Sequence, residues 1–328
     1  MSSVKWLRYF RLVVATDGSN TEALDLSDFR CVFKISQAVI GKPCTAEITV
    51  YNVAKSTVDR IQVPTNAVVG SKRLRVIIEA GYQNDHSVIF QGDLWWKSVG
   101  RESETETFMR LVAASGDRAH QYAVVNASIP KGASQEEVFS AVAASFAEKG
   151  VPTGSKPTLM ATKLPRGKVL YAMSADAMQG IADTNGFDWG YTASGLVAIR
   201  KDQSYDPNEE VIVLNSKTGM LGRPMLTVEG VEVESLLLPK ADIGTLVQID
   251  NRSIQRENYD TSVSQGAMQT NMAVTDDMIS ADGLYRVVGR EHSGDTRGNE
   301  WRTKLVCFGV NAAQQPLTPT SLNNIPNL

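Results

Sequence analysis

A short motif, Val-Gly-Arg-Glu, occurs twice in this chain, at residues 99–102 and again at residues 288–291. Each copy follows a strand-like run of apolar residues. Each then leads through a polar turn into a second such run, in which an aromatic residue precedes a Leu-Val pair. An internal repeat of this kind predicts two copies of one β-hairpin unit. It also constrains assembly, because an oligomer of such a chain presents twice as many equivalent surfaces as it has subunits.

The apolar pattern divides the chain into four parts. Residues 1–114 contain runs that alternate at period two, and they predict a first β unit. Residues 115–205 predict an α+β insert, and residues 206–312 predict a second β unit that contains a long polar loop at 251–281. Ordinary connections between strands are much shorter, so this loop is expected to be functional or locally disordered. Residues 313–328, rich in Pro, Asn and Thr, predict a surface tail.

Within the insert, local signals predict two helices and a hairpin. Ser134 and Glu137 have the spacing of a capping box, so we expect a helix to begin there. A second helix is expected after Ser174, with its end at Gly186. Alternating aromatic residues at 187–191 then predict a β-hairpin.

Composition excludes several function classes. The chain has 328 residues with a net charge of −3, which argues against a strongly basic nucleic-acid binder. Three widely spaced cysteines offer no disulfide framework, as expected for assembly in a reducing cytoplasm. No apolar run approaches the ~20 residues of a membrane span, and charges interrupt the N-terminal segment, so neither membrane insertion nor a signal peptide is expected.

Recognisable catalytic motifs are absent from the sequence. It contains no phosphate-binding G-x-x-x-x-G-K-[ST] and no G-x-S-x-G elbow. The three histidines, His86, His120 and His292, lie too far apart to suggest a metal site. We therefore assign no catalytic, cofactor-binding or metal-binding residue and expect no enzymatic activity.

The doublet Trp95-Trp96 is a candidate interface. Adjacent residues on a strand point to opposite faces, so one indole is expected inside the β unit and the other outside. The outer indole is covered either by the neighbouring domain of the chain or by another subunit, since Trp is enriched at subunit interfaces. The sequence leaves both alternatives open.

Five further residues are candidate interface residues. Arg101 and Arg290 occupy the same place in the two motif copies, and we expect them to meet similar neighbours in a ring. The glycines before them predict a bulge or a close backbone approach. The long polar loop contributes Asn251, Tyr259 and Asp277.

The order of these segments resembles the baseplate hub proteins of contractile-tailed bacteriophages. The resemblance covers residues from about 30 to 310 and rests on order and extent rather than on one motif. It is carried by the segments at 46–53, 76–82, 89–92, 214–224, 230–239 and 285–301. The loop at 251–281 is longer than the family pattern, which leaves its partner open.

The resemblance implies a mainly β fold with two tail-tube-like antiparallel β-barrels and the α+β insert. It implies a homotrimer whose six barrels form a pseudo-sixfold ring. Such a ring joins the hexameric tail tube to the trimeric central spike, touches other baseplate components, and lets double-stranded DNA pass without specific binding. The protein would then be a structural part of the virion tail, assembled in the host cytoplasm.

Two other functions remain as alternatives. A tail-associated cell-wall hydrolase would use the insert as its catalytic domain, although residues 115–205 show no paired-carboxylate signature. Another double-barrel ring or adaptor protein of a contractile injection machine would share the repeat and differ in its layer within the particle.

Overall fold

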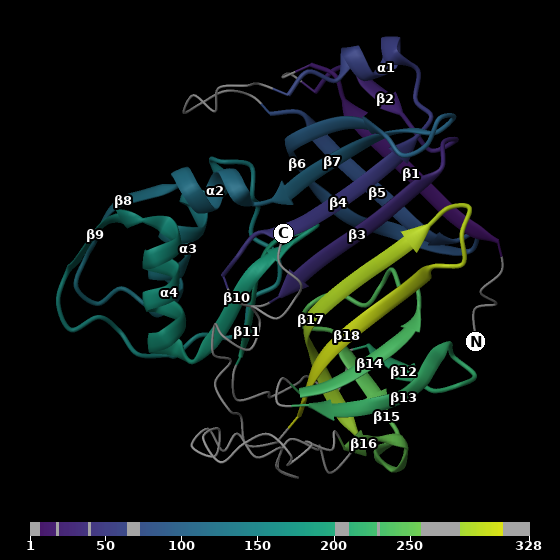
Figure 1. Cartoon of the computed structure of the whole chain (residues 1–328). Helices are drawn as coiled ribbons and strands as arrows, with labels where there is room; N and C mark the ends of the chain where they lie inside the picture. The colour runs from purple at the N-terminus through teal and green to yellow at the C-terminus, as the bar shows by residue number, and fades with distance from the viewer. Residues whose placement is uncertain are drawn as a thin grey trace, which may run out of the picture.

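The computed structural model describes residues 7–17, 20–38, 41–63, 73–200, 210–227, 230–256 and 283–310. Figure 1 shows a first β unit, an α+β lobe beside it and a second β unit below. The predicted tail, and the predicted loop beyond residue 256, lie outside the described residues. No described helix is long and apolar enough to cross a membrane.

The first unit is built from strands whose alternate residues are buried. In β4 every second side chain enters one apolar core, and in β3 the same holds from Cys31 to Ile35, as the period-two pattern predicts. One short helix, α1, follows β4. The elements are β1 (Arg8–Ala15), β2 (Ala23–Asp25), β3 (Cys31–Ala38), β4 (Cys44–Tyr51), α1 (Lys55–Arg60), β5 (Arg75–Tyr82), β6 (Asp85–Arg101) and β7 (Thr107–Ser115).

The α+β insert has an apolar core of its own. The capping box is confirmed: the Ser134 hydroxyl accepts from the Glu137 N–H at 3.2 Å, and the Ser134 N–H donates to the Glu137 carboxylate at 2.6 Å. The strand pair β8–β9 was not predicted. The elements are α2 (Asp117–Tyr122), β8 (Val124–Ile129), α3 (Gln135–Ala147), β9 (Lys168–Met173), α4 (Ser174–Asn185), β10 (Phe187–Thr192) and β11 (Gly195–Arg200).

The second unit packs a smaller core of mainly Leu, Val and Ile side chains. Its last hairpin, drawn in yellow in Figure 1, runs beneath β3 of the first unit. The elements are β12 (Val211–Leu214), β13 (Met220–Thr227), β14 (Gly230–Leu236), β15 (Leu246–Ile249), a 3-10 turn (Asn251–Ser253), β16 (Gln255–Arg256), β17 (Leu284–Asp295) and β18 (Trp301–Gly309).

The two β units share one strand order. In the first unit the neighbours run β3-β4-β7-β6-β5-β1, and in the second they run β13-β14-β18-β17-β15-β12. The repeated hairpin therefore belongs to a repeated unit of six strands. One difference is that β1 pairs with β5 in antiparallel fashion, whereas β12 pairs with β15 in parallel fashion.

The two hairpins align through a bulge rather than through the repeated motif. The β6–β7 register shifts between Leu94 and Trp96, and the β17–β18 register shifts between Val287 and Gly289. Trp95 thus corresponds to Val288. Arg290 corresponds to Lys97, and Arg101 corresponds to Gly294.

The turns agree with this alignment. The Glu102 N–H donates to Glu106 O, and the Asp295 N–H donates to Glu300 O, both at 2.9 Å. The expected duplication is present in the strand order. The expected equivalence of Arg101 and Arg290 is wrong by four positions, because identical letters fall at different distances from the bulge.

One strand pairing joins the two units into a single sheet. β17 pairs with β3 over seven residues, from Gly289 opposite Ala38 to Asp295 opposite Val32. The mainly β class is confirmed. Strand pairing among the described residues follows an open path, so closure of each unit into a barrel stays a prediction.

Candidate assembly interface

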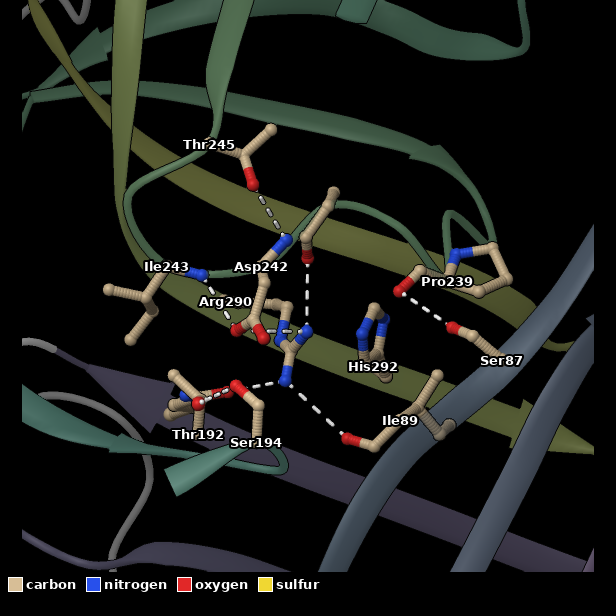
Figure 2. Close-up of polar contacts among 12 residues, drawn as sticks. Ser87, Ile89, Thr192, Ser194, Pro239, Asp242, Ile243, Thr245, Arg290 and His292 are labelled. Carbon is tan, nitrogen blue, oxygen red and sulfur yellow. Dashed lines mark hydrogen bonds and ion pairs between the residues drawn. The ribbon is translucent and has the colours of Figure 1, made fainter. Parts of the chain in front are cut away.

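Arg290 is the centre of a buried junction where three parts of the chain meet, as Figure 2 shows. Its guanidinium donates to Ala241 O at 3.0 Å, to Ile89 O at 3.4 Å and to the Gln37 side-chain oxygen. It also lies 3.3 Å from the Asp242 carboxylate. The side-chain nitrogen of Gln37 donates to Tyr191 O at 2.6 Å, which brings in the insert. One arginine therefore connects β17, β3, β6 and the segment after β14.

Other contacts hold the same two units together. The Trp301 indole N–H donates to Gly81 O at 3.3 Å, and the Ser87 hydroxyl donates to Pro239 O at 3.2 Å. Trp301 and Leu237 pack into the core of the first unit rather than into that of the second. Arg30 forms an ion pair of 2.8 Å with Asp295 at the far end of β17. The pairing of β17 with β3 is thus backed by apolar, polar and charged contacts.

His292 lies fully buried on β17, two residues beyond Arg290 and on the same face. Its Nδ1 lies 2.8 Å from the Thr303 hydroxyl, which also accepts from the Leu238 N–H at 2.9 Å. Burial, and secondly the charge of Arg290, hold the pKa of His292 well below its usual value. The imidazole is therefore neutral at pH 7, which suits a packed position beside a cation.

Both tryptophans of the doublet are exposed, Trp95 by 58% and Trp96 by 46%. The expectation that one indole would point inward is wrong. Trp95 is the extra residue of the bulge, so alternation is interrupted and both side chains leave the core after Leu94. Val99, on the same half of β6, is 56% exposed. The later half of β6 therefore exposes three large apolar side chains, with Trp96 and Val99 on opposite faces of the strand.

The remaining candidate residues lie apart from one another. Arg101 is exposed at the end of β6, the strand that also carries Trp95 and Trp96. Arg290 is only 4% exposed, so the expectation that it contacts another subunit is wrong: its partners are inside its own chain. Asn251 begins the 3-10 turn after β15. Tyr259 and Asp277 lie outside the described residues.

Sequence reasoning missed the acceptors around Arg290. Gln37, Ile89 and Ala241 come from segments far apart in the chain, and none belongs to a recognisable motif. Of these three, only Gln37 is noticeable in the sequence, because it is a polar residue at a position of β3 where the alternation calls for a buried apolar one. A buried amide needs hydrogen-bond partners, so its position indicates a polar junction without identifying the partner.

A small pocket lies between the first unit and the insert. Its polar lining includes Arg75, Arg118, Lys149 and Asp93, which is the one acidic side chain among the described residues around it. Burial raises the pKa of Asp93, while Arg75 opposes that shift. Hydrolysis of glycosides ordinarily uses two carboxyl groups that face one substrate. This pocket does not present that arrangement.

The cysteines also make poor nucleophiles. Cys31, Cys44 and Cys307 are free and buried. Burial raises the pKa of the thiols of Cys31 and Cys44 to about 12. Burial also raises the pKa of the Cys307 thiol. A thiol is reactive as its thiolate, which these surroundings disfavour at neutral pH. The cysteines therefore read as core residues.

No family model and no curated protein matches the sequence. Several solved structures match its fold, among them the following two. The 43 kDa tail protein of prophage MuSo2 from Shewanella oneidensis has a TM-score of 0.56 at 8% identity, covering 93% of this chain and 99% of that one. The E. coli c3393 protein, a type VI secretion system component described as structurally similar to the T4 bacteriophage tail proteins gp27 and gp5, has a TM-score of 0.50 at 10% identity. That match covers 88% of this chain and 76% of that one. The chain therefore has the fold of a phage tail protein and of a type VI secretion component, which confirms, at the level of fold, the resemblance to baseplate hub proteins.

Proposed function

We propose that this protein is a structural baseplate hub of a contractile phage tail. Three copies form a ring in which the six β units, each closed into a tube-like barrel, alternate around a central channel. Residues 1–114 and 206–312 supply the barrels, and residues 115–205 form the insert. The ring joins a hexameric tail tube to a trimeric spike, and DNA passes through it.

The observation that carries this proposal is the repeated strand order within one chain. A threefold body that carries two similar units per chain offers six similar surfaces to a sixfold tube. Closed rings are the expected result of a head-to-tail contact that does not propagate into a filament. The fold shared with a prophage tail protein supports a place in the tail.

The small negative net charge of the chain is compatible with a channel through which DNA passes without being held. Each Lys or Arg that binds a phosphate releases counterions, and many such contacts would hold DNA strongly. The net charge of −3 does not favour such retention. Passage without specific binding is therefore part of the proposal.

A second candidate is a ring protein of a secretion machine with the same two units. The likeness to the c3393 protein favours it, because that protein is described as a type VI secretion component. Both candidates share the ring and differ in the particle that contains it. Imaging the intact particle from its source would separate them.

The ring is tested by the mass of the purified chain in solution. Light scattering coupled to size exclusion should give three times the 35.7 kDa of one chain. Adding purified tail-tube protein and spike protein should then shift this species to a larger complex. A chain that stays monomeric at all concentrations and binds neither partner would overturn the proposal.

A further inference from the structure

The cavity between the first β unit and the insert has two separate walls. The first unit contributes the start of β5 and the middle of β6. The insert contributes α2, the turn that follows α3, and the turn between β10 and β11. The cavity volume is about 230 Å³. Since a water molecule takes up about 30 Å³ of liquid volume, a small organic ion fits inside.

Positive side chains outnumber negative ones around this cavity. Arg75, Arg118 and Lys149 line it, and Asp93 is the acidic side chain among its described lining residues. Within the described part of the chain, no hydrogen bond or ion pair engages the side chains of Arg118 and Lys149. Clefts lined by charges of one sign concentrate ions of the opposite sign. The cavity is therefore expected to attract anions.

Arg75 has a donor that the described residues do not satisfy. It lies opposite Asp93 in the pairing of β5 with β6, yet the two side chains form no ion pair with each other. The Nε atom of Arg75 is buried and has no hydrogen-bond partner among the described residues. Buried donors are nearly always paired, so this nitrogen calls for an acceptor. An anion in the cavity would supply one.

The nearest other carboxylate is already occupied. Asp117 precedes Arg118 in α2, but its carboxylate accepts from Arg73 at 2.8 Å and from the Gln121 side chain at 2.7 Å. Arg73 is thus neutralised by Asp117, whereas Arg118 is not. Both Arg75 and Arg118 act electrostatically on the Asp93 carboxyl, so the two guanidinium groups surround one side of the cavity.

The insert wall of the cavity is held in place by hydrogen bonds. The Leu196 N–H donates to Pro152 O, and the Gly154 N–H donates to Leu196 O, both at 2.8 Å. Gly195 has a φ of +128°, and a Cβ there would lie 2.1 Å from Pro152 O, so the β10–β11 turn packs directly on the segment after α3. The other wall is the β5–β6 ladder. Sites with such fixed walls are largely formed before a ligand arrives.

We propose that this cavity binds a small phosphate-bearing anion, either inorganic phosphate or a phosphate monoester. Three cations against one ionised carboxyl leave an excess of two positive charges, which a phosphate dianion offsets. The guanidinium groups of Arg75 and Arg118 match the geometry of phosphate oxygens, and Lys149 adds a point charge. Because the walls come from both parts of the chain, the ligand would connect the insert to the first unit. The inference goes beyond the proposed ring and does not depend on it.

Calorimetric titration of the full chain tests this binding. Inorganic phosphate and glycerol 3-phosphate are titrated at constant ionic strength, with chloride as the balancing anion. We expect saturable binding at one site per chain and a melting temperature that rises with phosphate concentration. Tighter binding of glycerol 3-phosphate would identify a monoester as the ligand, and equal or weaker binding would identify inorganic phosphate. If neither probe binds saturably, the proposal is overturned.

Charge variants test where the anion lies. Arg118→Met should weaken phosphate binding at least tenfold, and Lys149→Met should weaken it in the same direction. Asp93→Asn should strengthen it, because the opposing negative charge is removed. Lys131→Met is the matched control, since Lys131 is an exposed cation of the insert that does not line the cavity. Near-ultraviolet circular dichroism confirms that each variant is folded.

Opposite effects of the cationic and acidic variants distinguish a binding site from a merely structural role. Equal weakening in Lys131→Met and Arg118→Met would indicate non-specific attraction and overturn the site. Asp93→Asn binding that is not strengthened would also contradict it, because the carboxyl would then not face the anion. None of these measurements depends on the oligomeric state, so they leave the test of the ring by light scattering separate.

Discussion

At the scale of single residues, the two motif arginines show how position decides the role of a side chain. Arg290→Met removes the donor for three buried acceptors and should lower the free energy of unfolding by about 3 kcal/mol, because unpaired buried polar groups are costly. Arg101→Met, at an exposed strand end, should change it by less than about 0.5 kcal/mol. Urea unfolding followed by fluorescence measures both. Equal losses in the two variants would contradict the burial of Arg290.

His292 supplies a pH dependence with a defined sign. Its pKa in the folded chain lies well below its value of about 6.5 in the unfolded chain. As the pH falls below about 6.5, His292 binds a proton in the unfolded state but not in the native state. The free energy of unfolding therefore decreases, by at most about 1.4 kcal/mol per pH unit. His120, whose pKa is lowered by burial, contributes in the same direction.

The test compares slopes rather than absolute stabilities. His292→Gln should flatten the decline of the melting temperature between pH 7.5 and about 5.5, while His120 keeps its part of that decline. Asp25 and Asp295 have lowered pKa values, so they lose stabilisation only near the usual range of carboxyl groups and do not affect this window. Parallel pH profiles for wild type and variant would show that His292 is not buried as a neutral group.

At the scale of elements, the capping box of α3 is the feature that sequence and structure share most directly. Ser134→Ala removes the acceptor for the Glu137 N–H and should cost about 1 kcal/mol. Ser140→Ala, on the exposed face of the same helix, should be neutral or slightly stabilising, since Ala has the higher helix propensity. Thermal unfolding of the two variants decides; an unchanged Ser134→Ala protein would mean that the cap is not formed in solution.

Elements with strong local signals were predictable. The alternation in β3 and β4 and the start of α3 follow from neighbouring residues alone. The β8–β9 pair was missed because its strands are separated by α3 and carry several exposed residues, so no clear alternation appears. The bulge at Trp95 was missed for a related reason: one inserted residue reverses the facing of every side chain after it.

At the scale of the whole molecule, the repeated motif predicted that the chain contains two β units, but it did not predict how the two units are joined. Two units with one strand order were indicated by the motif pair. The pairing of β17 with β3 joins the two units and depends on residues more than 200 positions apart, such as Arg290 and Gln37. The pattern of one sequence does not indicate which of such distant residues lie opposite each other. The offset of four positions between the motif copies has the same origin. Each copy is aligned by its strand partners and its bulge.

The central claim is that three chains place six similar β units in one ring. Averaged electron micrographs of the purified protein, viewed along the ring axis, test it most directly. The account predicts a closed ring with a central channel, six inner lobes, and threefold symmetry from three outer insert lobes. A ring of six chains, a twofold dimer or particles without a channel would contradict it.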